Sequence, residues 1–167
     1  MPKKRSTKTD SKASKQLNKQ PKKPKTLTHA KAKKKADEWF SKYVRWSAAD
    51  ADGTCTCFTC SRTHHASRIQ AGHFASRRHN ATRYDLNNVR PQCAACNIFK
   101  QGEQWIFGRN LDREQRGRAV EIMRRANEPR KFTTAELEHI YRHYQERAMQ
   151  YCKIKKVLPH DRPAREV

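Results

Sequence analysis

The chain has little apolar material and few acidic side chains for its length. Of its 167 residues only 35% are apolar, so a large hydrophobic core is excluded and something other than burial must help to stabilise the fold. No apolar run approaches the length needed to cross a bilayer, and the charged N-terminus is not followed by the apolar stretch of a signal peptide. We therefore expect an intracellular protein without a membrane partner.

The shortage of acidic residues leaves a strongly basic chain. Lys and Arg number 38 against 16 Asp and Glu, which gives a formal net charge of +22. Residues 1–35 hold 14 of these basic residues, a single acid, Asp10, and almost no apolar side chains, which predicts a disordered basic arm. Subtracting the arm's +13 from +22 leaves +9 on residues 36–167. Such a charge favours a nucleic acid as partner, although charge alone does not distinguish DNA from RNA.

An amphipathic helix is predicted over residues 32–49. Its apolar residues recur at helical spacing, and we expect Trp39 and Phe40 to face a core rather than to stack on bases. The following segment, 54–102, is irregular and contains most of the cysteines. Within it one β-hairpin is predicted, between residues 68–74 and 88–92.

The C-terminal region, residues 111–167, is predicted to be helical. Asp112 with Gln115, and Thr133 with Glu136, resemble capping boxes that begin two helices. In the last helix one face carries the apolar residues Leu137, Ile140, Tyr141, Tyr144 and Ala148, which we interpret as packing residues. Cys152 lies alone in this helical pattern and is expected to pack as well.

Two Cys-x-x-Cys turns, Cys57 to Cys60 and Cys93 to Cys96, predict a metal site. Two-residue spacing lets both thiolates of a turn bind one tetrahedral ion, and two such turns form a closed Cys₄ site of the structural zinc type. Zinc would then replace part of the missing core, because its binding free energy becomes folding free energy. Cys55 is an alternative to Cys57 or a spare thiol; the tight turn favours Cys57.

The stretches around these turns carry a family resemblance. They read "ADEWFSKYVR" at 36–45, "CFTC" at 57–60, "QAGHF" at 70–74, "NVRPQCAACN" at 88–97 and "KQGE" at 100–103. Together they resemble the phage NinG (Rap) recombination proteins and, more broadly, the HNH or ββα-metal endonucleases. The resemblance implies a small α+β fold in which residues 36–110 form a zinc-stapled ββα-metal (His-Me finger) core, flanked by N- and C-terminal α-helices.

The resemblance also implies catalytic roles for His73, Asn88 and Asn97, the last in place of a final His. Hydrolysis of a phosphodiester needs a base and a cation, and His73 can take a proton from water at neutral pH. We predict that Asn88 orients the imidazole, caps a turn, or does both. Asn97 follows Cys96 on an expected helix, so its side chain can present an oxygen ligand to Mg²⁺ or Mn²⁺ on another face.

One position departs from the endonuclease pattern. Many HNH enzymes place a metal-binding Asp before the catalytic His, and here that residue is Gly72. Asp85 is an alternative carboxylate ligand, although a plain turn residue is the favoured interpretation of it.

A group of basic residues surrounds the motif in sequence and is expected to hold the DNA backbone without reading bases. It comprises Arg68, Arg77, Arg78, Arg83, Arg90 and Lys100, with Arg62 and Arg109 at its margins. His79 is a further candidate for a phosphate contact.

These observations favour a metal-dependent DNA endonuclease. As the resemblance implies, its substrate is expected to be branched DNA such as a Holliday junction or D-loop, and its place the cytoplasm of a bacterium or phage-infected cell. Symmetrical cutting would suit a homodimer. The alternatives are a non-catalytic zinc-knuckle recombination accessory protein, in which His73 is structural, and an RNA-binding protein.

Overall fold

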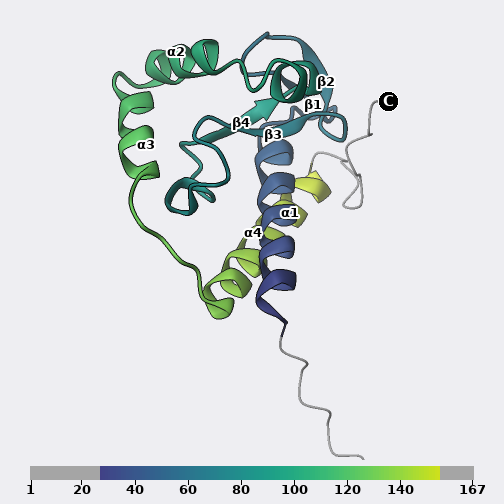
Figure 1. Ribbon diagram of the computed structural model, residues 1–167. Helices are drawn as coiled ribbons and strands as arrows, with labels where there is room; N and C mark the ends of the chain where they lie inside the picture. The colour runs from purple at the N-terminus through teal and green to yellow at the C-terminus, as the bar shows by residue number, and fades with distance from the viewer. Residues whose placement is uncertain (1–26, 155–167) are drawn as a thin grey trace, which may run out of the picture.

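The computed structural model describes residues 27–154, in which short strands lie between longer helices. The elements are α1 (His29–Ser47), β1 (Thr54–Thr56), β2 (Thr63–His65), β3 (Gln70–His73), β4 (Val89–Gln92), α2 (Gln104–Glu114), α3 (Arg118–Ala126) and α4 (Thr134–Ile154). Single turns of 3₁₀-helix and π-helix cover Asn80–Thr82 and Ala95–Phe99. β1 pairs with β2, and β3 with β4, both antiparallel, so the fold is a small α+β structure (Figure 1).

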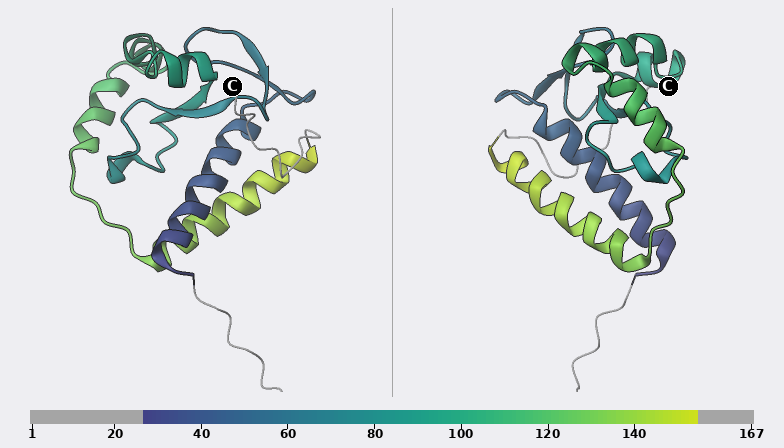
Figure 2. Two further views of the ribbon diagram at one scale, coloured as in Figure 1. Left: turned by 45° about the vertical axis from the view of Figure 1, so that its right-hand side comes forward. Right: turned by 90° about the vertical axis from the view of Figure 1, so that its left-hand side faces the viewer.

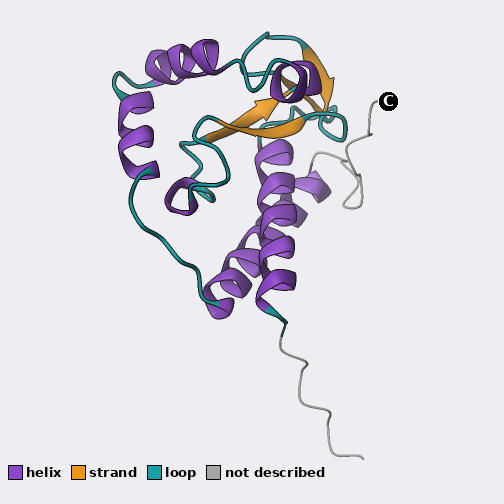
Figure 3. Ribbon diagram, viewed as in Figure 1, coloured by secondary structure: helices purple, strands orange, loops and turns teal. Residues whose placement is uncertain are grey.

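The β3–β4 hairpin confirms the predicted pairing of 68–74 with 88–92. Its register sets Gln70 opposite Gln92 and Gly72 opposite Arg90. The strands lie at the C-terminal end of α1, as Figure 3 shows. His73 is therefore the last residue of a strand that contacts α1, and the loop 74–88 connects this strand to β4.

Helices α1 and α4 run side by side in both views of Figure 2 and form the base of the molecule. α1 begins at His29, after Thr28, whose hydroxyl accepts a hydrogen bond from the Lys31 N–H at 3.4 Å. The predicted boundary of the arm at residue 35 is therefore too far along the chain. Residues 29–35 are helical because Ala32 and Ala36 pack on Leu137 of α4. The rest of the arm, residues 1–26, lies outside the described residues.

The two predicted capping boxes have different outcomes. Thr133 and Glu136 form one at the start of α4: the Glu136 carboxylate accepts from the Thr133 N–H at 2.7 Å, and the Glu136 N–H donates to the Thr133 hydroxyl at 3.2 Å. The box at Asp112 is wrong, because α2 already begins at Gln104 and Asp112 lies near its end. The Asp112 carboxylate instead accepts from the Ala119 N–H at 2.9 Å and joins α2 to α3.

The core consists of three small groups of buried residues rather than one large one. The main group joins α1, α4 and the strands, and it contains Phe40, Trp46, Ile69, Val89, Cys55 and Cys152, with Trp39 and Tyr144 packed against it. A second group, around Phe107, Leu111 and Ile122, holds α2 and α3 together. The core-facing interpretation of α1 and α4 is thus confirmed. No helix in the described part of the chain combines the length and apolarity needed to span a membrane.

Candidate metal centre and adjoining cavity

The four cysteines of the two Cys-x-x-Cys turns come together although 32 residues separate the turns in sequence. The sulfurs of Cys57, Cys60, Cys93 and Cys96 all lie within 4.8 Å of one another. The Cys60 and Cys93 sulfurs are 3.8 Å apart, and a tetrahedral ion with Zn–S bonds of about 2.3 Å requires about this separation. The predicted pairing with Cys57 is confirmed, because Cys57 and not Cys55 belongs to the cluster of four sulfurs.

Hydrogen bonds hold the Cys57 sulfur in place. The Cys93 N–H donates to it at 3.3 Å, and the Thr59 hydroxyl lies 3.4 Å from it. Gln92 Nε2 donates to the same hydroxyl at 3.2 Å, so the Thr59 proton is directed toward the sulfur. Burial opposes ionisation of Cys57, but these hydrogen bonds lower the pKa of its thiol to about 6.

The other buried thiols resist ionisation in the absence of a cation. Burial raises the pKa of Cys93 to about 12 and also raises the pKa of Cys96. Four sulfurs this close become thiolates together only when a cation compensates their charge, and soft sulfur donors in a tetrahedral arrangement suit zinc. The donor set therefore fits a structural zinc ion held by all four cysteines.

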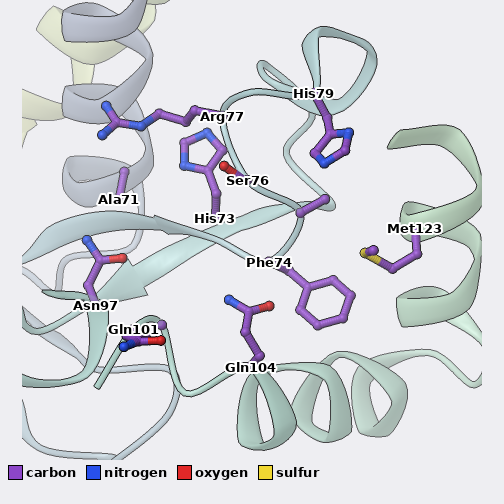
Figure 4. Close-up of a pocket in the computed structure, with 12 residues that line it drawn as sticks. Ala71, His73, Phe74, Ser76, Arg77, His79, Asn97, Gln101, Gln104 and Met123 are labelled. Carbon is purple, nitrogen blue, oxygen red and sulfur yellow. The ribbon is translucent and has the colours of Figure 1, made fainter. Parts of the chain in front are cut away.

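A polar cavity of about 450 Å³ adjoins this centre. Figure 4 shows its lining, which comes from β3, the loop that follows it, residues 97–104 up to the start of α2, and Met123 of α3. The polar lining residues are His73, Ser76, Arg77, His79, Asn97, Gln101 and Gln104. None of the residues that line the cavity is an Asp or a Glu. The structure thus brings His73 and Asn97 of the predicted catalytic group to one cavity.

His73 is held in one tautomer by the backbone. Its Nε2 lies 3.0 Å from the Arg83 carbonyl oxygen, which can only accept, so Nε2 carries the proton and the neutral ring has its lone pair on Nδ1. Burial lowers the pKa of His73 to about 4, the Arg83 carbonyl opposes this shift, and the nearby charge of Arg77 adds to it. His73 is therefore an unprotonated imidazole at neutral pH.

Asn97 presents its oxygen while its nitrogen is engaged. Its Nδ2 donates to Gln70 Oε1 at 2.5 Å, and Oδ1 has no hydrogen-bond partner among the described residues. The turn Ala95–Phe99 is π-helical rather than the expected α-helix, yet it keeps the predicted division of roles. Cys96 points into the sulfur cluster, whereas Asn97 lines the cavity.

Asn88 is fully buried, and its side-chain hydrogen bonds go to residues other than His73. Its Oδ1 accepts from the Ala75 N–H at 2.6 Å, and its Nδ2 donates to the carbonyls of Ala75 and Thr82, both at 2.9 Å. Asn88 therefore fastens the loop between β3 and β4, which agrees with its turn-capping interpretation. The imidazole is held instead by the Arg83 carbonyl, which follows the 3₁₀ turn Asn80–Thr82 within that loop.

The contacts of Asp85 do not support its prediction as a catalytic metal ligand. Its carboxylate accepts from the Asn87 N–H at 2.9 Å and forms an ion pair with Arg125 at 2.8 Å. Asp85 also lines a different cavity from His73. A carboxylate with these partners closes a turn, as its alternative interpretation predicted.

The space beside Gly72 is filled by Gln92. A Cβ atom added at Gly72 would lie 2.2 Å from Gln92 Oε1 and 2.8 Å from its Cβ. Gln92 is fully buried, and its Nε2 donates to Thr59 and to the Gly102 carbonyl at 2.7 Å. This packing explains why the carboxylate expected at position 72 is absent.

Three of the six basic residues predicted to bind DNA form ion pairs within the protein. Arg83 is buried and forms a bidentate ion pair with Asp37, with N–O distances of 2.8 and 2.6 Å. Arg90 pairs with Glu114 at 2.5 Å, and Lys100 with Glu103 at 2.8 Å. The internal pairs of Arg83 and Arg90 replace the predicted backbone contacts, since partly buried, paired guanidinium groups are not available to phosphate.

Arg68, Arg77 and Arg78 are exposed and form no ion pair within residues 27–154. Arg77 also lines the cavity, so it is the best placed of the predicted phosphate contacts. His79 lines the cavity too, with its Nδ1 2.9 Å from the Ala126 carbonyl. Sequence reasoning missed Gln70 and Gln104; the alternation along β3 placed Gln70 on the same face as Gly72, but nothing identified its bond to Asn97.

Fold and site together define a small, basic α+β protein with a four-cysteine metal centre beside a polar histidine cavity. The chain matches the family described as Bacteriophage Lambda NinG protein over residues 1–154, and it belongs to that family. This membership indicates a phage protein related to recombination. No curated protein and no solved structure is found to match the chain.

Proposed function

We propose that this protein is a metal-dependent endodeoxyribonuclease with an HNH-like core that hydrolyses phosphodiester bonds in branched DNA. The observation that carries the proposal is the state of His73. A neutral imidazole, held through Nε2 by a backbone carbonyl, lies at a cavity with an exposed arginine and a free amide oxygen. A general base for water at neutral pH needs this protonation state and this restraint.

In this proposal His73 Nδ1 takes a proton from the attacking water while Nε2 keeps its own proton on the Arg83 carbonyl. Arg77 holds the phosphate, because a guanidinium fork matches two phosphate oxygens. Asn97 Oδ1 would hold Mg²⁺ or Mn²⁺, which would neutralise the charge that develops on the phosphate. The remaining positions of that ion fall to water and substrate, since the cavity lining has no carboxylate.

Family membership supports the choice of branched recombination intermediates, such as a Holliday junction or D-loop, as the substrate class. A homodimer would place two such cavities for paired cuts. The Cys₄ centre supports the site indirectly, because Cys96 and Asn97 are adjacent in one turn and zinc would fix the position of both.

A non-catalytic recombination accessory protein is the second candidate. The observation in its favour is the cavity lining, which lacks any Asp or Glu, together with the close packing of Gly72 against Gln92. In that case the neutral, buried His73 serves only to close the loop on the Arg83 carbonyl. RNA binding is a third candidate that rests on charge alone.

The decisive experiment compares wild type, His73→Ala and His79→Ala on labelled four-way junction, D-loop and linear duplex, each with Mg²⁺, Mn²⁺ or neither. His79 is the matched control, because it is the other histidine that lines the cavity. We expect His73→Ala to abolish cleavage and keep binding, and His79→Ala to keep cleavage while weakening binding at most modestly, as the loss of one candidate phosphate contact would. Asn97→Ala should raise the Mg²⁺ concentration needed for cleavage by about tenfold or more. DNA binding without cleavage by wild type on every substrate supports the accessory role.

A further inference from the structure

The outward face of α2 combines an exposed aromatic side chain with arginines. Trp105 is 80% exposed in the first turn of the helix. Arg109 and Arg113 follow at intervals of four residues, which places them on the same face because a helix has 3.6 residues per turn. The opposite face packs into the protein through Phe107 and Leu111. A single exposed aromatic ring is ordinary on a protein surface, so its meaning depends on what surrounds it.

This face begins at the rim of the cavity. Gln104, the residue before Trp105, lines the cavity with His73 and Asn97, and Figure 4 places it where α2 starts. Phe99, which is 71% exposed, lies two residues after Asn97, just before the residues that connect its turn to α2. Two exposed aromatic rings therefore flank the chain segment that leads from Asn97 to α2.

The charges on this face are available to a ligand. Arg109 forms no hydrogen bond or ion pair within the described part of the chain, and Arg113 has one weak hydrogen bond, to Asn110 at 3.3 Å. Asp112, the nearest acid in this stretch, is turned toward the Ala119 N–H. Free guanidinium groups beside an exposed ring favour an anionic partner with flat aromatic groups.

The other exposed apolar residues of the helices differ in this respect. Val120 is 73% exposed on α3, beside Met123, but the neighbouring Arg124 is neutralised by Glu121 at 2.8 Å and Glu128 at 3.0 Å. That surface offers apolar contact without free positive charge. The α2 face alone combines both among the described helices that border the cavity.

We infer that the outward face of α2 binds unpaired bases of DNA beside the cavity, with Trp105 stacked on a base and Arg109 on a neighbouring phosphate. Nucleotide bases supply the flat rings and the phosphates supply the anions, and stacking of this kind tolerates any sequence. The inference deepens the proposed function, on which it rests, by naming the part of the substrate that α2 recognises. It assigns to this protein a preference for DNA with a single-stranded segment at the cut.

The test measures the binding of a labelled single-stranded DNA oligonucleotide and of a blunt duplex of the same sequence. All variants carry His73→Ala, so that no cleavage occurs and the result does not depend on nuclease activity. Trp105→Ala should weaken single-strand binding by about tenfold, the value of one stacked base, and should change duplex binding less than twofold. Trp105→Phe should restore most of the loss, and Val120→Ala is the matched exposed control.

Several results would overturn the inference. They are an equal loss on both DNA forms, no loss with Trp105→Ala, tighter binding of single-stranded RNA of the same sequence, or a changed oligomeric state of Trp105→Ala in sedimentation. Because Trp105 is exposed, this variant should fold, and its melting temperature checks that it does. If wild type cleaves no DNA but Trp105→Ala still loses single-strand binding selectively, the proposed reaction is wrong and the single-strand site is supported.

Discussion

The four-cysteine centre and the His73 cavity share the turn Ala95–Phe99 but differ in how completely their donors are used. In the centre, four sulfurs converge within 4.8 Å and the tight turns leave no position open for a substrate. In the cavity, the Asn97 oxygen has no hydrogen-bond partner within residues 27–154, and the His73 imidazole is neutral. A closed donor set serves the fold, whereas an open one is available for chemistry. We therefore expect changes at the centre to act on stability and, under the proposed function, changes at the cavity to act on cleavage.

Removal of one cysteine should have the largest effect and act on stability. Cys93→Ser deletes a thiolate from the centre, and apparent binding free energies of structural zinc are about 10–16 kcal/mol in small domains. We expect loss of bound zinc and of the cooperative melting transition, measured by metal analysis and circular dichroism. Cys55→Ala, a buried cysteine outside the cluster, should keep stoichiometric zinc. If Cys93→Ser kept its zinc and its melting transition, the four-cysteine centre would not be what stabilises the fold.

Acid should reveal the buried histidine of the cavity. The folded pKa of His73 is about 4 against an ordinary value of 6.5, so between these values the unfolded chain binds the proton and the folded protein does not. Its contribution to stability is complete above pH 6.5 and falls by about 3 kcal/mol as pH drops toward 4. His73→Gln can still donate to the Arg83 carbonyl but does not titrate.

Urea unfolding of wild type and His73→Gln at a series of pH values isolates this effect, since all other titrations cancel in the difference. We expect the wild type to lose stability relative to the variant as pH falls from 6.5 to 4. Parallel curves for the two proteins would mean that His73 is not buried as a neutral ring. If His73 is the general base of the proposed nuclease, the same shift predicts that cleavage is lost on the acidic side only well below pH 6.5.

Restoring the missing carboxylate should destabilise the protein rather than improve the cavity. Gly72→Asp brings a Cβ to 2.2 Å from Gln92 Oε1, and overpacking of this kind costs about 1–3 kcal/mol. The midpoint of urea unfolding measures the loss. The double variant Gly72→Asp, Gln92→Gly makes room and should recover part of it relative to Gln92→Gly alone. A Gly72→Asp protein as stable as wild type would show that Gln92 does not set the identity of residue 72.

Local patterns predicted much of the fold and one of the two sites. The helical spacing of apolar residues in α1 and α4, the Thr133–Glu136 capping box and the β3–β4 hairpin all follow from neighbours within a few residues. The Cys-x-x-Cys turns predicted the metal cluster, because a two-residue spacing already sets two sulfurs for one ion. The pattern at Asp112 failed because a capping motif does not reveal that a helix has already begun.

The cavity was only partly predictable. His73 and Asn97 lie together as predicted, and Asn88 fastens its own loop, but Asp85 and Arg83 pair with residues 40 and 46 positions away, which no spacing reveals. Arg83 illustrates the reason: its guanidinium pairs with Asp37, on a helix that reaches it only after folding. The sequence alone does not show whether a basic residue is free to contact phosphate, because the acid that pairs with it can come from another element of the fold.

Composition and short-range spacing were enough to predict the basic charge, the helix periods and the four cysteines of the cluster, because each depends on residue content or on residues close together in the chain. The tertiary structure alone decided which arginines remain free, why position 72 is glycine, and which atom holds His73. It also placed Trp105 outward at the rim of the cavity, with Phe107 inward. These are long-range contacts, and their partners are chosen by the packing of α1, the hairpin and α2 against one another.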